Sequence, residues 1–189
     1  MDTNAVDTSM TGGYDIEKVR SDFPILSRKI HGKPLVYLDS AASAQKPKVV
    51  IDALVSAYCD TYSNVHRGLH YLSNVTTEKY EGVRETVRRF LGASKQEEIL
   101  LNSGTTEGIN TVSYGWAASR LKAGDEIILS VMEHHANIVP WHFLRERQGV
   151  VLKWVEPEPN GQFDHTKLMN KITSRTKLIA ITQMSNVLG

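Results

Sequence analysis

The sequence has little cysteine, no long apolar run and almost no net charge. Cys59 is the single cysteine among 189 residues, so no disulfide can form within the chain and we expect a reducing compartment. No apolar stretch reaches the length of a membrane span, and residues 1–13 lack the basic start and apolar core of a signal peptide. The net charge of +1, with acids and bases mixed, favours no nucleic-acid partner. These absences predict a soluble, cytoplasmic protein with no nucleic-acid or membrane partner.

Apolar residues make up 41% and charged residues 23% of the chain, which is an ordinary balance for a folded domain. We expect residues 1–13 to form a disordered tail. The periodicity of the next segments predicts helices at 15–22, 47–58 and 76–91 and a strand at 34–39. After residue 97, strands at 98–102, 126–130, 150–155 and 177–182 alternate with helices at 106–121, 138–148 and 164–172. This alternation predicts an α/β fold, with a mostly parallel sheet covered by helices on both faces.

Ligands bind at the carboxyl ends of the strands in a parallel sheet, and three such ends carry unusual residues. The first is the small-residue turn at 102–108, Asn-Ser-Gly-Thr-Thr-Glu-Gly, which leads into a helix. Helix N-termini present free N–H groups to phosphate, and Thr105 and Thr106 can add hydroxyl groups. A threonine helix cap without a ligand explains the same residues. The spacing matches neither a Walker loop nor a dinucleotide-binding fingerprint.

The second strand end carries two adjacent histidines, His134 and His135. Neighbouring side chains of an extended segment point to opposite faces, so at most one of them faces the ligand side and a shared metal ion is disfavoured. That histidine could stack on a planar cofactor or transfer a proton, and a hydrogen-bonded structural histidine is the alternative. The third strand end carries Ser185 and Asn186, and an asparagine there can bind an oxygen of a bound ring or form a turn.

Two other features have structural explanations. His66 and His70 are separated as zinc ligands on a helix would be, but Gly68 between them weakens a helix, and we interpret the segment as a loop without metal. Cys59 follows Ile51 and Val55 on one helical stripe, so we expect it to be buried and inert rather than a nucleophile.

Five segments, in this order along the chain, resemble the SufS-type (group II) cysteine desulfurases. They are Asp39–Pro47, Val65–Gly68, Gly104–Asn110, Met132–Trp141 and Ser185–Gly189, and the similarity extends over about residues 15–189. The resemblance implies a pyridoxal-phosphate (PLP) enzyme of fold type I. It assigns residues 14–34 to the small domain and residues 35–189 to the N-terminal, incomplete part of the large PLP-binding domain.

The resemblance also implies roles for individual residues. His134 stacks on the pyridine ring and takes part in proton transfer, Thr105 and Thr106 hold the phosphate, and Asn186 lies near the ring hydroxyl and the substrate carboxylate. Ala41 and Ala42 line the substrate pocket, and His66 and Arg67 lie near its entrance. The implied reaction converts L-cysteine to L-alanine and an enzyme-bound persulfide for iron–sulfur cluster assembly. A homodimer and a SufE- or SufU-like sulfur acceptor are the implied partners.

The sequence departs from this family in length, because family members are about twice as long. The cofactor-anchoring lysine in Ser-Gly-His-Lys, the aspartate in Asp-Gly-Ala-Gln, the nucleophilic cysteine and the carboxylate-binding arginine have no counterparts here. We therefore expect this chain to be a truncated fragment that is inactive alone. The alternatives are a related selenocysteine lyase, which shares these N-terminal motifs, and a non-catalytic fragment that acts only by association. A zinc protein is a more distant alternative.

Overall fold

The computed structural model describes residues 14–189, and the tail expected at residues 1–13 lies outside this range. The chain forms two compact units, one ending at Ile99 and the other covering Leu100–Gly189. The boundary predicted after residue 34 is not the boundary between these units and stays a prediction about the complete protein. Within residues 14–189, no helix is long and apolar enough to cross a membrane.

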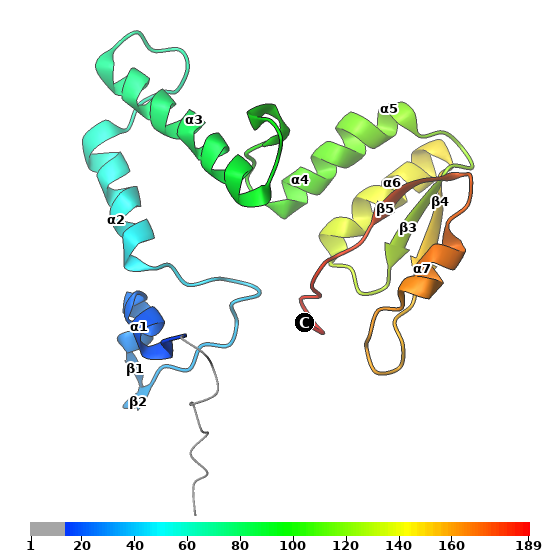
Figure 1. Ribbon diagram of the computed structural model, residues 1–189, viewed down its shortest axis with the longest axis horizontal. Coiled ribbons are helices and arrows are strands. Elements are labelled where there is room, and N and C mark those ends of the chain that lie inside the picture. Colours follow the sequence, from blue (N-terminus) through cyan, green and yellow to red (C-terminus); the bar gives the residue numbers. More distant parts are fainter. Residues whose placement is uncertain (1–13) are drawn as a thin grey trace, which may run out of the picture. The chain divides into compact units, whose positions relative to one another are not determined.

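The N-terminal unit is mainly helical. Its elements are α1 (Ile16–Ser21), a 3-10 turn (Pro24–Ser27), an antiparallel hairpin of β1 (Lys29–Ile30) and β2 (Lys33–Pro34), α2 (Lys48–Ser56), a π-helical turn (Ala57–Thr61), α3 (Tyr71–Leu91) and a 3-10 turn (Gln96–Glu98). Figure 1 shows α3 as the longest helix of this unit. It begins at Tyr71 rather than at residue 76, because Nδ1 of His70 accepts a hydrogen bond from the Ser73 N–H at 3.4 Å and extends the helix by a turn.

Three expectations for this unit and its boundary are wrong. Residues 35–39 and 98–102 form no strand, because no other segment of residues 14–189 pairs with them. Cys59 is exposed rather than buried. The physical reason is that α2 buries none of its residues, so its apolar stripe of Ile51 and Val55 has no packing partner in the part of the chain that the structure describes.

The C-terminal unit is the predicted α/β structure. Its elements are α4 (Thr105–Thr111), a π-helical turn (Val112–Ala117), α5 (Ala118–Arg120), β3 (Glu126–Ser130), a 3-10 turn (His135–Asn137), α6 (Val139–Gln148), β4 (Val151–Val155), α7 (His165–Lys171) and β5 (Thr176–Ala180). The segments from α4 to α5 follow one another without a break, as the predicted helix at 106–121 requires. Asp164 caps α7 as expected, with its carboxylate accepting the Thr166 N–H at 2.7 Å.

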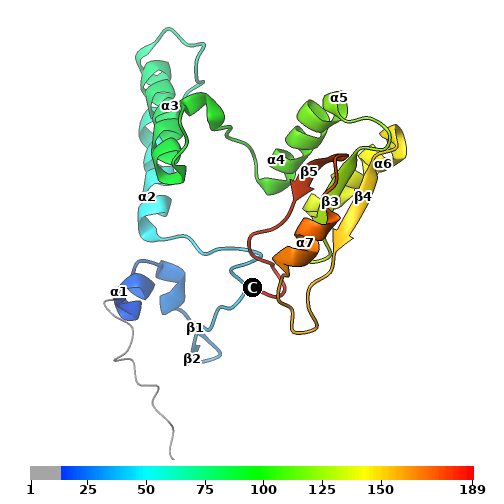
Figure 2. The same cartoon turned by 45° about the vertical axis from the view of Figure 1, so that its right-hand side comes forward.

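The sheet has the strand order β4-β3-β5, and both pairs are parallel (Figure 1). All five residues of the central strand β3 are buried, which confirms the expectation of a doubly covered sheet. Ile127 and Leu129 face the core formed with Ala117, Leu121, Trp141, Leu144 and Val150. Lys153 of β4 lies on the opposite face, where its ammonium group donates to the Lys171 carbonyl of α7. Figure 2 shows α6 and α7 on the two sides of the sheet.

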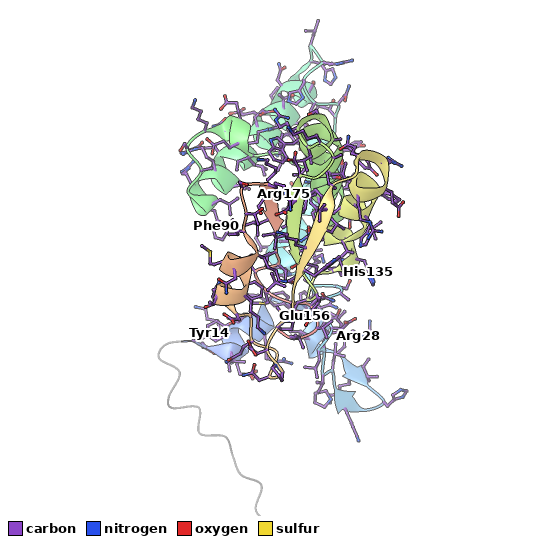
Figure 3. All side chains as sticks on the ribbon, turned by 90° about the vertical axis from the view of Figure 1, so that its right-hand side faces the viewer. Tyr14, Arg28, Phe90, His135, Glu156 and Arg175 are labelled. Carbon is purple, nitrogen blue, oxygen red and sulfur yellow. The ribbon has the colours of Figure 1, made fainter. Side chains whose placement is uncertain are left out.

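A buried carboxylate joins the three strands at their amino ends. Glu126 of β3 is fully buried, and its carboxylate contacts Lys153 Nζ at 2.7 Å and Arg175 Nη2 at 2.9 Å. The hydroxyls of Thr173 and Thr176 also donate to it, at 2.7 and 3.1 Å. Hydrogen bonding from Lys153, followed by Thr173, lowers the pKa of Glu126 from 4.5 to about 2. In Figure 3, Arg175 lies at the end of the sheet opposite to His135 and Glu156.

The Glu126 cluster predicts an acid-sensitive sheet. Because the pKa of Glu126 is lower in the folded state, its interactions stabilise the fold above about pH 4.5 and are lost as the pH falls toward 2. We expect Glu126→Gln to lower stability at neutral pH and to flatten its pH dependence between about 2 and 4.5. Urea unfolding followed by tryptophan fluorescence measures this, since Trp116, Trp141 and Trp154 all lie in the C-terminal unit.

Glu146→Gln is the matched control, because Glu146 makes only an exposed ion pair with Arg145 at 3.8 Å. An unchanged pH dependence in the Glu126 variant would show that the buried carboxylate does not control acid unfolding.

Candidate functional site

The C-terminal unit contains an open cleft of about 620 Å³ beside the carboxyl ends of β3 and β5. Its volume lies within the ordinary range for small-molecule sites. The cleft brings together all four residues that the sequence predicts around a cofactor, namely Thr105, Thr106, His134 and Asn186. The apolar side chains of Ile109, Val112 and Trp141 also line it, so the cleft combines an apolar surface with a few polar groups.

The predicted phosphate turn is stabilised by its own side chains. The Gly104 N–H donates to Asn102 Oδ1 at 2.9 Å, and the Ser103 N–H donates to Glu107 Oε2 at 2.7 Å. Gly104 has a φ of 135° and a ψ of 173°, a conformation that is essentially restricted to glycine. The next two N–H groups, of Thr105 and Thr106, have no acceptor within residues 14–189. They begin a helical stretch that continues to Arg120 and are free to meet an anion.

Glu107 follows these threonines, and it was not singled out as a site residue from the sequence. The backbone hydrogen bond from Ser103 lowers the pKa of the Glu107 carboxyl. Its carboxylate is therefore engaged with the backbone of the turn, and its role is to fix the loop in front of α4. A Glu at the third helical position is the sequence signal for a bond back to the start of the helix, and here it reaches the residue before the N-cap Gly104.

The loop after β3 directs the two histidines differently. His134 caps the 3-10 turn His135–Asn137, and its Nδ1 accepts the Ala136 N–H at 3.1 Å. In the neutral ring the proton therefore lies on Nε2. His134 lines this cleft and His135 does not, while both histidines line a smaller pocket of about 320 Å³. The rings are 6.1 Å apart at an interplanar angle of 71° and do not share a metal-ligand geometry. Across residues 14–189, no group of three potential metal ligands occurs.

Asn186 lies in a turn that Ser185 holds. Ser185 is buried, and its hydroxyl oxygen accepts the N–H groups of Val187 and Leu188, each at 3.1 Å. The Ser185 carbonyl accepts the Gly189 N–H at 3.0 Å. Asn186 itself is exposed, so its amide is available to the cleft that it lines.

The other four predicted residues belong to the N-terminal unit. Ala41 and Ala42 are exposed in a turn in which Asp39 O accepts the Ala42 N–H at 3.2 Å. His66 has a φ of 68°, and its Nε2 lies 2.6 Å from Glu81 Oε1 of α3. The adjacent Arg67 is exposed. The Gly68 N–H donates to Ser73 Oγ at 3.1 Å, and a Cβ on Gly68 would lie 2.3 Å from that atom, which explains the glycine.

A carboxylate network behind His134 was not predicted from the sequence. Glu133 accepts hydrogen bonds from Ser130, Asn137 and the Thr182 N–H, and Asn137 accepts one from Trp141. The sequence signal was weak, because Glu133 precedes the 3-10 turn His135–Asn137 and its partner Thr182 is remote in sequence.

The site fits the phosphate and ring of PLP. Free N–H groups and two threonine hydroxyls lie at the start of α4, while His134 and Asn186 provide a flat ring and an amide at the same cleft. These groups match an anion attached to a planar, polar heterocycle.

The chain is similar to known proteins over most of its length. The Aminotransferase class-V family matches residues 36–189. The cysteine desulfurases of Salmonella gallinarum and Escherichia coli O7:K1 are each 52% identical over 176 residues, covering 93% of this chain and 43% of the relative. The chain thus spans less than half the length of these curated relatives.

Solved structures show the same likeness. Apo cysteine desulfurase from Thermococcus onnurineus NA1 is 36% identical with a TM-score of 0.84, covering 95% of this chain and 43% of that one. Cysteine desulfurase CsdA of Escherichia coli, in its S-sulfonic acid form, is 37% identical with a TM-score of 0.75, covering 92% and 42%.

This chain therefore belongs to the Aminotransferase class-V family. The fold predicted from the sequence, that of the large domain of fold type I PLP enzymes, is confirmed. A C-DES mutant with the same fold, 20% identical with a TM-score of 0.70, has glycine covalently linked to its PLP cofactor.

The geometry of Gly104 predicts a specific sensitivity of the turn. A Cβ there would meet nothing within 4 Å, so Gly104→Ala adds no clash and only strains the backbone. We expect it to cost about 1–3 kcal/mol in the free energy of unfolding of the C-terminal unit. Gly115→Ala is the matched control, because Gly115 is exposed and helical, with equally open space. Urea unfolding should show a loss of stability for Gly104→Ala and none for Gly115→Ala. Equal losses would contradict the positive φ of Gly104.

Proposed function

We propose that this chain is the N-terminal, cofactor-binding part of a SufS-type cysteine desulfurase. The observation that carries the proposal is the meeting of three separate loops at one cleft, with Thr105 and Thr106, His134 and Asn186 facing it. The 52% identity to cysteine desulfurases over 93% of the chain supports the assignment of the activity. The substrate is L-cysteine, and the products are L-alanine and sulfur held as a persulfide on an enzyme cysteine.

In this proposal the start of α4 binds the cofactor phosphate. The N–H groups of Thr105 and Thr106 point out of the first helical turn, and the two hydroxyls supply further donors. Glu107 and Asn102 already bind the N–H groups of Ser103 and Gly104, so the free donors are limited to those that face the phosphate. PLP, when bound, supplies the electron sink that allows the bond between carbon and sulfur of the substrate to break.

In this proposal His134 orients the pyridine ring of the cofactor and transfers a proton. Because its Nδ1 is engaged with the Ala136 N–H, the Nε2 atom is the position that can hold or release a proton toward the substrate. The same bond fixes the plane of the imidazole ring, which can then stack on the cofactor. Asn186 donates or accepts a hydrogen bond at the ring oxygen and the substrate carboxylate.

Further parts of the proposal concern the complete protein. Ala41 and Ala42 line the substrate pocket, and His66 and Arg67 lie near its entrance, with His66 held by Glu81. The enzyme acts as a cytoplasmic homodimer and passes its sulfur to a SufE- or SufU-like acceptor for iron–sulfur cluster assembly. Residues 1–189 contain no Ser-Gly-His-Lys segment, and Cys59 belongs to the N-terminal unit, whereas the residues that line the cleft belong to the C-terminal one.

Phosphate binding is tested by Thr106→Val, which keeps the shape of the side chain and removes its hydroxyl. A hydrogen bond to a charged group contributes about 1.5–3 kcal/mol, so we expect PLP to bind roughly ten- to hundredfold more weakly. Titration of the chain with PLP, followed by quenching of the tryptophan fluorescence to which Trp141 at the cleft contributes, measures the affinity. Thr166→Val, at the start of α7, is the control and should leave the affinity unchanged. Equal affinities of the Thr106 variant and the unmodified chain would remove Thr106 from the phosphate site.

The activity is tested in a chimera in which this chain replaces the matched region of the Escherichia coli O7:K1 relative. We expect alanine and sulfide production from cysteine, and a loss of about 10²- to 10⁴-fold on His134→Ala, the usual contribution of acid–base catalysis. His135→Ala is the matched comparison and should retain most activity, since His135 does not line the cleft that Thr105, Thr106 and Asn186 share with His134. A chimera that prefers selenocysteine would favour the lyase alternative, and equal losses in both variants would contradict the role of His134.

The chain alone is expected to form no covalent lysine adduct with PLP and no alanine. The reason is that its sequence has no counterpart of the family's cofactor-anchoring lysine segment. The chain is mixed with PLP, reduced with borohydride and mapped by mass spectrometry, and cysteine is then supplied and alanine measured. A single modified lysine together with alanine production would overturn this expectation.

A further inference from the structure

Glu133 forms the centre of a hydrogen-bond network between the loops that carry His134 and Asn186. It is 8% exposed, and its Oε1 accepts the Ser130 hydroxyl at 2.6 Å and the Thr182 N–H at 2.9 Å. Its Oε2 accepts Asn137 Nδ2 at 2.8 Å. In turn, Asn137 Oδ1 accepts Trp141 Nε1 at 3.0 Å. The carboxylate therefore joins the end of β3, the 3-10 turn after His134, and the segment after β5.

Two groups that can only donate fix the directions of the bonds to Asn137 and to one carboxylate oxygen. The Trp141 indole N–H is a donor, so Asn137 must turn its oxygen toward Trp141 and its amide nitrogen toward Glu133. The Thr182 N–H is also a donor, so the other carboxylate oxygen must accept. Two acceptor oxygens are needed at position 133, and only a carboxylate provides them. A glutamine has one oxygen, and its amide nitrogen would face a second donor.

We propose that Glu133 is a positioning residue that sets His134 and Asn186 at their places around the cofactor ring. His134 adjoins Glu133 in sequence and caps the turn that Asn137 closes, and its Nδ1 bond to the Ala136 N–H lies within that turn. Thr182 precedes the loop of Ser185 and Asn186, and its hydroxyl donates to the Met184 carbonyl at 2.7 Å. His134 and Asn186 line the same cleft. The inference rests on the proposed function, because the ring that they meet is the cofactor of that proposal.

The network predicts different effects for two substitutions. In Glu133→Gln the oxygen stays with its two donors, Ser130 and Thr182, and the amide nitrogen faces Asn137 Nδ2. The Asn137 bond is then lost, and the turn that orients His134 loosens, while the Thr182 bond persists. In Glu133→Ala the bonds to Asn137 and to the Thr182 N–H are both lost. Exchange of the Thr182 N–H should then accelerate roughly tenfold or more, as loss of a bond to a charged acceptor implies.

The orientation of His134 has a spectroscopic readout that needs no cofactor. Nitrogen NMR of the histidine rings at about pH 8, where a free imidazole is neutral, reports which ring nitrogen carries the proton. The unmodified chain should show the Nε2–H form of His134, identified by the signal that His134→Gln removes. Glu133→Gln should give a mixture of the two forms. Glu146→Gln, at an exposed glutamate of α6, is the matched control and should leave the ratio unchanged.

Rescue by Trp141→Phe provides the decisive test. Without the indole donor, Asn137 is free to rotate its amide and present its oxygen to the glutamine nitrogen, so the network closes again. We expect the double variant, Glu133→Gln with Trp141→Phe, to match Trp141→Phe alone in the His134 proton ratio, within about twofold. Glu133→Ala should not be rescued. A merely structural carboxylate would show no such dependence on the residue at position 141.

The outcomes separate this inference from the proposed function. If Glu133→Gln leaves the His134 ratio unchanged, or if Trp141→Phe gives no rescue, Glu133 is not a positioning residue. If the NMR results are as expected and Glu133→Gln also weakens PLP binding, the inference holds in full. If the chain binds no PLP while the NMR results are as expected, the proposed function fails and the positioning of His134 by Glu133 stands.

Discussion

The burial of β3 between two parallel neighbours is the constraint on which the C-terminal unit depends. Its five residues are inaccessible on both faces, and its backbone pairs with β4 on one side and β5 on the other. Because all three strands run in the same direction, the loops that follow β3 and β5 leave the sheet at the same edge. For this reason His134 and Asn186, which are far apart in sequence, meet at one cleft. The start of α4 also lines this cleft, and Ile109 of α4 packs against the core.

Each end of β3 is closed by a buried glutamate, and the two carboxylates are satisfied in different ways. Glu126 at the amino end meets two cations and two hydroxyls, and its negative charge is balanced by Lys153 and Arg175. Glu133, just past the carboxyl end, meets only neutral donors from Ser130, Asn137 and Thr182. The first arrangement joins strands through charge. The Glu133 arrangement places no cation among its donors at the cleft edge of the sheet. It fixes which groups donate and which accept, instead of balancing a charge.

The sequence predicted the C-terminal unit well because its signals are local and mutually consistent. The apolar run at 126–130 coincides with β3, and Asp164 caps α7 where the capping rule places it. The strands predicted at 34–39 and 98–102 failed because a strand needs a pairing partner, which composition does not supply. Cys59 was misjudged for a similar reason, since a helical stripe is buried only where another surface packs on it. The positions of the four cofactor residues came from the strand ends and their roles from the motif resemblance, whereas Glu133 was missed because its partner Thr182 is remote in sequence.

The residues that face the cleft share one construction, in which an exposed side chain adjoins a residue whose polar groups are used internally. His134 follows buried Glu133, Asn186 follows buried Ser185, and Thr105 follows a glycine whose N–H is bound by Asn102. The first residue of each pair, which is buried in the cases of Glu133 and Ser185, makes its hydrogen bonds within the loop, and the residue after it is left free for a ligand. Precision at such a site therefore depends on atoms that never touch the ligand. It follows that substitutions which preserve size but reverse a donor and an acceptor should damage the site more than their volume suggests.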